Sequence, residues 1–143
     1  MSLVNKVRSY TTGIPGRSLN QVGPHHFVID GAARSGGPAE ELAPGDAFLS
    51  GVSGCGVLLV ERTAAEEGVR VGRIEATIEG IRDEADPSWF QVVRLHFMLE
   101  GVDQATAERL VAVYQRKCPL YRTVAAATTV EVKVSTLEHV PVG

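Results

Sequence analysis

Two cysteines are the side chains in this 143-residue sequence with the clearest capacity for covalent chemistry. Cys55 lies in a glycine-rich apolar stretch, and Cys118 stands directly before Pro119. A cysteine thiolate can act as a nucleophile or bind a metal, whereas a buried thiol can also serve as a small hydrophobic side chain. The pattern alone favours the core-filling role for both cysteines and leaves the reactive role open.

Other site motifs are weakly represented. No Cys-X-X-Cys pair is present, which excludes a thioredoxin-type dithiol, and no P-loop or dinucleotide-type glycine loop occurs. The adjacent His25 and His26 suggest a metal, but His96 and His139 have no ligand-like spacing with either cysteine. We therefore expect neither a metal nor another cofactor.

Composition and charge narrow the class of protein. A net charge of −3 without a basic stripe argues against a nucleic-acid partner. The longest apolar run is too short for a membrane span, and the N-terminus lacks the apolar core of a secretory signal, so we expect a cytoplasmic protein. A hydrophobic content of 44% suits a single globular domain over residues 1–143. In a reducing compartment, two cysteines are more typical of reactive, metal-bound or buried thiols than of a permanent bridge.

The element that must position Cys55 is a long helix, predicted over residues 44–68. Pro44 suits a first helical turn, Asp46 adds negative charge near the positive end of the helix dipole, and Gly68 can end the helix. Apolar residues lie on both of its faces, which predicts a helix buried all round: Phe48, Leu49, Val52, Val57, Leu59 and Val60.

Glycines interrupt the middle of this helix at Gly51, Gly54 and Gly56. Each one costs roughly 1 kcal/mol of helix propensity relative to alanine, so close packing must compensate for the loss. Glycine also lets another backbone approach closely. The sequence therefore predicts tight packing on either side of Cys55.

The remaining elements predict an α+β fold with antiparallel sheets around the long helix. Strands are expected over residues 4–12, 25–30, 71–82, 89–100 and 128–135, a second helix over 103–117, and a short helical turn over 120–127. The apolar stripe of the second helix includes Tyr114 and continues to Cys118, which therefore lies on the inward face where this helix ends. Pro119 disfavours continuation of the helix, because it restricts the residue before it.

Two segments carry a resemblance to a known family. The run PGDAFLSGVSGC on the long helix, followed later by KCPLYRT, resembles the OsmC/Ohr family of osmotically inducible and organic hydroperoxide resistance proteins. The resemblance covers most of the chain and extends to the order of strands and helices. It implies an intertwined homodimer in which the two central helices pack together and the sites lie at the subunit interface.

The resemblance also implies a reaction. In peroxidase members of the family, the cysteine of the central helix attacks an organic hydroperoxide as a thiolate and becomes a sulfenic acid. A second cysteine resolves this acid as a disulfide, which a small dithiol or a lipoyl-type reductant reopens. Carried over by motif, Cys55 would be the peroxidatic thiol and Cys118 the resolving thiol.

A buried thiolate needs a nearby cation, which the family supplies from an arginine on an N-terminal loop. Arg17, directly after a Gly-Ile-Pro-Gly turn, fits that position, and Arg34 is the second choice. The family often has Asn-Pro-Glu at the start of the central helix, but this chain has Gly45 in place of the glutamate. Asp46, one residue on, is shorter and points about 100° further round the helix, and Glu40 or Glu41 on the preceding loop is the alternative carboxylate.

Two functions remain open from the sequence. The first is a thiol-dependent peroxidase that acts on organic hydroperoxides. The second is a non-catalytic or small-ligand-binding OsmC-like protein without a tuned thiolate, and a metal-binding protein is a distant third. The residues around Cys55, which are Ser53, Gly54 and Gly56, differ from those of dedicated organic-hydroperoxide enzymes and indicate a broader OsmC-like member. The acidity of Cys55 and its distance from Cys118 discriminate between the first two functions.

Overall fold

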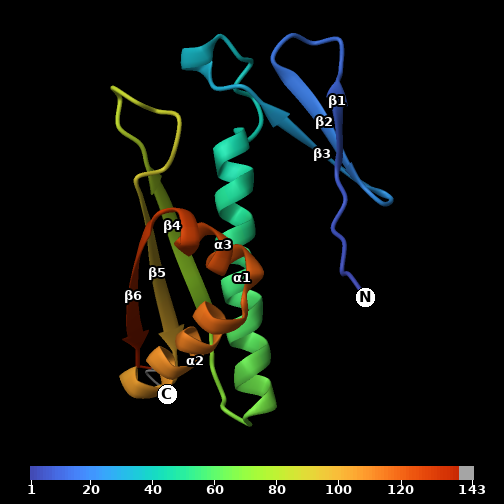
Figure 1. Cartoon of the computed structure of the whole chain (residues 1–143). Coiled ribbons are helices and arrows are strands. Elements are labelled where there is room, and N and C mark those ends of the chain that lie inside the picture. The colour runs from blue at the N-terminus through green and yellow to red at the C-terminus, as the bar shows by residue number, and fades with distance from the viewer. Residues whose placement is uncertain (139–143) are drawn as a thin grey trace, which may run out of the picture. The chain divides into compact units, whose positions relative to one another are not determined.

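The computed structural model describes residues 1–138, which divide into two compact units, one over Met1–Phe48 and one that begins at Leu49. The first unit contains a three-stranded sheet, and the second contains another three-stranded sheet with most of the helical residues (Figure 1). This arrangement of strands and helices is the α+β class that the sequence predicted.

The sheet of the first unit is antiparallel, in the order β1-β2-β3. Its strands are β1 (Arg8–Thr11), β2 (Arg17–Val22) and β3 (His25–Asp30), and a short 3₁₀ turn, η1 (Ala33–Ser35), follows. Strand β2 was not predicted, because its sequence RSLNQV is mostly polar and shows no hydrophobic alternation. It becomes a strand because it pairs with a neighbour on each side.

Helix α1 (Pro44–Glu66) confirms the predicted long helix, and Gly68 follows its end with a positive φ of 68°. The prediction that it is buried all round is wrong for the described chain, because Leu58 is 67% exposed and Phe48 is 51% exposed. The buried positions lie along one side: Leu49, Val52, Gly56, Leu59, Val60, Thr63 and Ala64. The sheet and second helix of the second unit contact this side of α1.

The sheet of the second unit is mixed, which corrects the prediction of antiparallel sheets. Strands β4 (Ile74–Ile81) and β5 (Val92–Glu100) form the predicted antiparallel pair, but β6 (Thr129–Leu137) runs parallel to β5. Two helices lie between β5 and β6 in the chain. They return it to the starting end of β5, as a parallel pairing requires.

These two helices are α2 (Gln104–Lys117) and α3 (Pro119–Ala127). Asp103 is the N-cap of α2, and its carboxylate oxygen accepts the Thr106 N–H at 2.8 Å. The segment predicted as a short helical turn over 120–127 forms the nine-residue helix α3, with Pro119 in its first turn. Among residues 1–138, no helix is long and apolar enough to cross a membrane.

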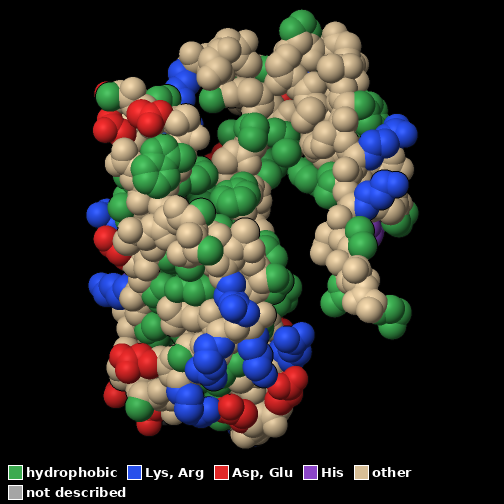
Figure 2. Space-filling model, in the orientation of Figure 1, with side chains coloured by type: hydrophobic (Ala, Val, Ile, Leu, Met, Phe, Trp, Pro, Cys, Tyr) green, Lys and Arg blue, Asp and Glu red, His purple; other side chains and the backbone are tan. Residues whose placement is uncertain are grey.

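The core of the second unit lies between its sheet and helices α1 and α2. Strand β5 contributes four alternating side chains that point into this core: Val93, Leu95, Phe97 and Leu99. Acidic and basic side chains are intermixed on the face of this unit drawn in Figure 2. Its ion pairs include Arg109–Glu67 and Arg62–Glu66.

Candidate functional site

Cys55 and Cys118 meet in the second unit, where their sulfur atoms lie 3.0 Å apart. Both are free thiols. This separation is about 1 Å longer than a covalent disulfide, so the pair can bond with only a small movement. Cys118 is fully buried, whereas Cys55 is partly exposed and is therefore the more accessible to a solute.

Cys118 occupies the junction between α2 and α3. Its backbone N–H donates to the Tyr114 carbonyl at 2.9 Å, which completes the end of α2. The sulfur is the N-cap of α3 and accepts the Tyr121 N–H at 3.4 Å. Pro119 disfavours a helical backbone at Cys118, which is extended with φ −79° and ψ 120°. The Cys-Pro step therefore turns the thiol toward α1.

The predicted tight packing beside Cys55 is present at Gly56, but the neighbours are side chains of the same chain. A Cβ at Gly56 would lie 2.6 Å from the Phe97 ring and 3.2 Å from the Tyr114 ring. A Cβ at Gly51 would lie 3.1 Å from Leu120, whereas one at Gly54 would meet nothing within 4 Å. Gly56 thus admits two aromatic rings against α1.

The surroundings of Cys55 favour its protonated thiol. Burial raises the pKa of Cys55 to about 11, and the hydrogen bond and charge of Cys118 act in the same direction. The positive charge of Arg62 on the same helix opposes this rise. Because Arg62 is largely exposed, water screens its charge. Among the described residues of the second unit, Arg62 is the cation that lowers the pKa of Cys55, and it does not offset the effect of burial.

The predicted arginine lies in the first unit, at the first residue of β2. Arg17 donates from Nε and Nη2 to the two carboxylate oxygens of Asp30, at 2.7 and 2.8 Å. Asp30 is fully buried and also accepts the backbone N–H groups of Glu40 and Glu41, each at 3.1 Å. The Arg17 hydrogen bond, followed by these N–H groups, lowers the pKa of Asp30 to about 2 despite its burial. The guanidinium is therefore held in one orientation.

Sequence reasoning missed Asp30. The only signal was an aspartate that ends an apolar strand, HHFVID, and such a residue is more often a turn former. Its position depends on the loop that follows, in which Gly31 donates to the Gly16 carbonyl at 2.8 Å. A Cβ at Gly37 would lie 2.1 Å from the Gly31 carbonyl oxygen, so only glycine allows this close approach.

The structure gives the other predicted site residues separate contacts. The Asp46 carboxylate accepts the Ala43 N–H at 3.1 Å and so caps the start of α1, while the carboxylate partner of Arg17 is Asp30. Glu40 lies 3.8 Å from the Arg17 guanidinium. Arg34 lies in η1 and is exposed.

Histidine contacts give no metal site in the described part of the chain. Within residues 1–138, no three His, Cys, Asp or Glu side chains gather as metal ligands. His25 and His26 are exposed at the start of β3, and His96 shares a hydrogen bond of 2.9 Å with Ser135. His139 lies outside the described residues.

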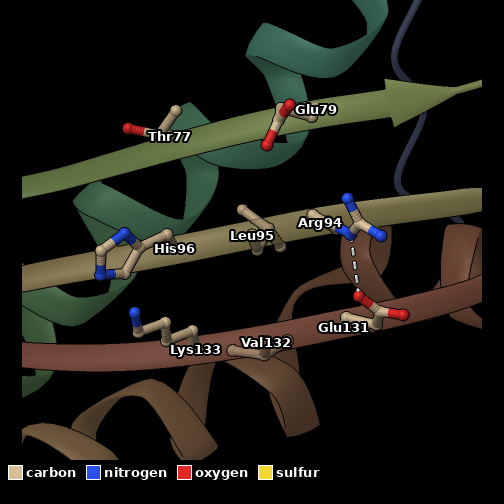
Figure 3. Close-up of a pocket in the computed structure, with 8 residues that line it drawn as sticks. All are labelled: Thr77, Glu79, Arg94, Leu95, His96, Glu131, Val132 and Lys133. Carbon is tan, nitrogen blue, oxygen red and sulfur yellow. Dashed lines mark hydrogen bonds and ion pairs between the residues drawn. The ribbon is translucent and has the colours of Figure 1, made fainter.

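The outer face of the second sheet carries an open cavity of about 390 Å³. Figure 3 shows its residues, which come from all three strands: Thr77, Glu79, Arg94, Leu95, His96, Glu131, Val132 and Lys133. Arg94 donates to Glu131 at 2.9 Å, so these two charged groups are paired with each other. Neither cysteine lines this cavity, and it is separate from the thiol pair.

The family model of OsmC-like proteins matches residues 37–133, which include both cysteines. The chain therefore belongs to the OsmC-like protein family. No curated protein matches its sequence significantly.

Solved structures share the fold. A hypothetical protein from Aquifex aeolicus VF5 aligns with a TM-score of 0.83 at 16% identity, over 97% of this chain and 100% of that chain. An OsmC-like protein from Mycoplasma pneumoniae gives a TM-score of 0.81 at 13% identity, over 96% and 99%. The organic hydroperoxide resistance protein OhrB of Bacillus subtilis gives 0.67 at 23% identity, over 92% and 98%. At these identities the likeness shows a common fold.

Proposed function

We propose that this protein is a thiol-dependent peroxidase that reduces organic hydroperoxides through Cys55 and Cys118. The observation that carries the proposal is the 3.0 Å separation of the two sulfur atoms. Two cysteines that only fill a core have no need of this geometry. Membership of the OsmC-like family, whose structural relatives include an organic hydroperoxide resistance protein, supports the same chemistry.

The reaction needs three balanced steps. The Cys55 thiolate attacks the distal oxygen of the hydroperoxide, the O–O bond breaks, and the leaving alkoxide takes a proton to give an alcohol. The Cys118 thiol then displaces water from the Cys55 sulfenic acid and forms a disulfide. A dithiol or lipoyl-type reductant donates two electrons and two protons to restore both thiols. The partly exposed Cys55 is the peroxidatic thiol because a solute can reach it, and the buried Cys118 is the resolving thiol.

The first step requires a cation near Cys55, and we assign this role to Arg17. Asp30 orients the Arg17 guanidinium by accepting hydrogen bonds from its Nε and Nη2 atoms. The third guanidinium nitrogen, Nη1, takes no part in these two hydrogen bonds. Asp30 thereby supplies the carboxylate that orients the arginine, a role that the family's glutamate has at the position of Gly45. Asp46 supports the start of α1, and Arg34 is the second candidate for the cation.

We further propose that the protein works as a homodimer of single-domain subunits with its sites at the subunit interface. Leu58 is 67% exposed on α1, and Gly54 has open space where a side chain would stand. A second α1 could cover this side of the helix. The dithiol cycle also suits a reducing, cytoplasmic compartment, where two thiols stay free between turnovers.

One observation favours a different function, a non-catalytic or small-ligand-binding OsmC-like protein. The pKa of Cys55 is raised to about 11, so that on the order of 10⁻⁴ of the thiols are ionised at neutral pH. A peroxidase with such a thiol would be slow unless Arg17 offsets the rise. The acidity of Cys55 therefore decides between the two functions.

The test is hydroperoxide consumption with a dithiol donor. The parent should consume cumene or tert-butyl hydroperoxide with dithiothreitol or a lipoyl donor, and hydrogen peroxide more slowly. Cys55→Ser should abolish turnover, whereas Cys118→Ser should leave a sulfenic acid on Cys55 that a dimedone-type reagent traps. Equal background rates in the parent and in Cys55→Ser would support the non-catalytic function.

A further inference from the structure

Tyr114 links the two helices that carry the thiols. It is fully buried on α2, and its backbone carbonyl accepts the N–H of Cys118 at 2.9 Å. Its hydroxyl donates across the core to the carbonyl of Val52 on α1, at 2.8 Å. Val52 lies three residues before Cys55. One side chain thus ties the turn before one cysteine to the turn before the other.

The Tyr114 ring is fixed in place by other aromatic rings. Phe97 packs edge-to-face against it with ring centroids 5.5 Å apart, and Tyr121 lies on it at 5.3 Å. Gly56 brings the helix surface against both Phe97 and Tyr114, because any side chain there would collide with the Phe97 ring. The hydroxyl is therefore directed at α1 by packing on several sides.

The hydroxyl also remains a donor over a wide pH range. Burial raises the pKa of Tyr114 well above its usual range, and the nearby Cys118 and Cys55 add to this effect. The phenol keeps its proton even where a thiolate forms beside it. The bond to Val52 can therefore persist while the thiols change their charge or oxidation state.

We propose that Tyr114 is a positioning residue that holds the Cys55 and Cys118 sulfur atoms within bonding reach of each other. A disulfide forms efficiently when its thiols are already close, since the cost of bringing them together has been met by the fold. Loss of the hydroxyl lets α1 and α2 separate in the reduced protein, which lowers the effective concentration of one thiol at the other. The proposal rests on the proposed function only in taking the pair as redox-active.

The test is the equilibrium between the thiol pair and glutathione. In this exchange, oxidised glutathione takes two electrons from Cys55 and Cys118, giving one intrachain disulfide and two molecules of reduced glutathione. Tyr114→Phe keeps the ring and removes the hydroxyl. It should lower the equilibrium constant about fivefold to tenfold, because the reduced variant gains backbone freedom, roughly that of one residue, which the disulfide-linked form does not gain. Tyr121→Phe is the matched control, because its hydroxyl bonds to Gln115 rather than α1, and it should change the constant less than about twofold.

A merely structural role would affect a different quantity. It would lower the melting temperature of the reduced and oxidised forms alike and leave the equilibrium constant unchanged, which would overturn the proposal. An equal loss in Tyr121→Phe would also overturn it. Gly56→Ala gives a second variant, which displaces the ring instead of removing the hydroxyl and should lower the same constant.

The glutathione equilibrium can be measured whether or not the protein consumes hydroperoxide. If the parent forms the disulfide with glutathione but consumes no hydroperoxide, the peroxidase function fails and the role of Tyr114 is still measured. If glutathione cannot oxidise the parent pair under conditions that oxidise a free dithiol, the positioning role fails even if hydroperoxide is consumed.

Discussion

Burial and the neighbouring Cys118 thiol raise the pKa of Cys55 to about 11, which opposes formation of the nucleophile. A change of one pKa unit corresponds to 1.36 kcal/mol of differential interaction between the two protonation states. A cation that returns Cys55 to an ordinary thiol pKa near 8.5 must therefore contribute about 3 kcal/mol. An arginine can do this because it stays charged at every relevant pH.

The rate of thiol alkylation against pH measures this contribution, because only the thiolate reacts. We expect the parent Cys55 to alkylate with a midpoint below 8.5. Arg17→Ala should move the midpoint up toward 11, the value that burial and the neighbouring Cys118 favour. Arg34→Ala should move it less, and Asp46→Asn should have an intermediate effect only if that aspartate helps to orient the arginine. A parent midpoint near 11 that Arg17→Ala leaves in place would assign the protein to the non-catalytic class.

The pKa of Asp30 is lowered, whereas that of Cys55 is raised. Its folded pKa of about 2 lies below the ordinary aspartate value, so the Arg17–Asp30 pair contributes stability above about pH 4 and loses it as the pH falls toward 2. Carbon NMR of the carboxyl group should show a midpoint near 2 in the parent. The midpoint should rise toward 4 in Arg17→Ala. An unchanged midpoint in that variant would show that the Glu40 and Glu41 N–H groups alone hold the carboxylate.

At the scale of elements, periodic segments were predictable and polar or non-local ones were not. Helices α1 and α2 and the inward side chains of β5 follow apolar spacing that the sequence displays. Strand β2 has no such spacing, since it depends on pairing with both neighbours. The parallel pairing of β6 depends on where α2 and α3 return the chain, which local residues do not encode.

The candidate site divides in the same way. Cys55 and Cys118 were predictable as inward positions, and the family resemblance suggested that they act together. Asp30 was not predictable, because its partners are Arg17 and two backbone N–H groups brought in by a loop. In the sequence, Tyr114 is one of several apolar positions on the second helix. Its special role depends on the hydrogen bond from its hydroxyl to the Val52 carbonyl, which the sequence does not reveal.

The glycines of α1 have different roles, which a pair of alanine substitutions separates. Gly56→Ala should lower the free energy of unfolding, because overpacking costs about 1–3 kcal/mol and exceeds the gain of about 1 kcal/mol in helix propensity. Chemical denaturation should show this loss at every protein concentration. Gly54→Ala is the control, because a Cβ at Gly54 would meet no atom of its own chain within 4 Å. Any decrease in its free energy of unfolding should therefore depend on protein concentration, as expected for a contact between subunits. Gly56→Ala with parental stability would contradict the close ring packing.

At the scale of the whole molecule, the exposed side of α1 is the feature that a single chain leaves incomplete. Leu58 on α1 is 67% exposed, although it is a large apolar side chain on the longest helix described. The proposed homodimer covers it with a second subunit. The same proposal places Cys55 and Cys118 at the interface between the two subunits.

Sedimentation at micromolar concentration tests the assembly. The parent should sediment as a dimer, and Leu58→Glu should shift it toward a monomer, because a carboxylate placed in an apolar interface loses its hydration. Leu58→Met preserves apolar surface and should remain dimeric. A parent that is monomeric and well ordered would contradict the interleaved architecture.

The central claim is that Cys55 and Cys118 form one redox unit, and a single-turnover titration tests it most directly. Reduced protein is treated with one equivalent of cumene hydroperoxide per chain, and its free thiols and peptide masses are then measured. The account predicts that two thiols per chain disappear, one equivalent of the alcohol forms, and Cys55 becomes linked to Cys118 within the same chain. An unchanged thiol count, or only mixed and intermolecular disulfides, would contradict it.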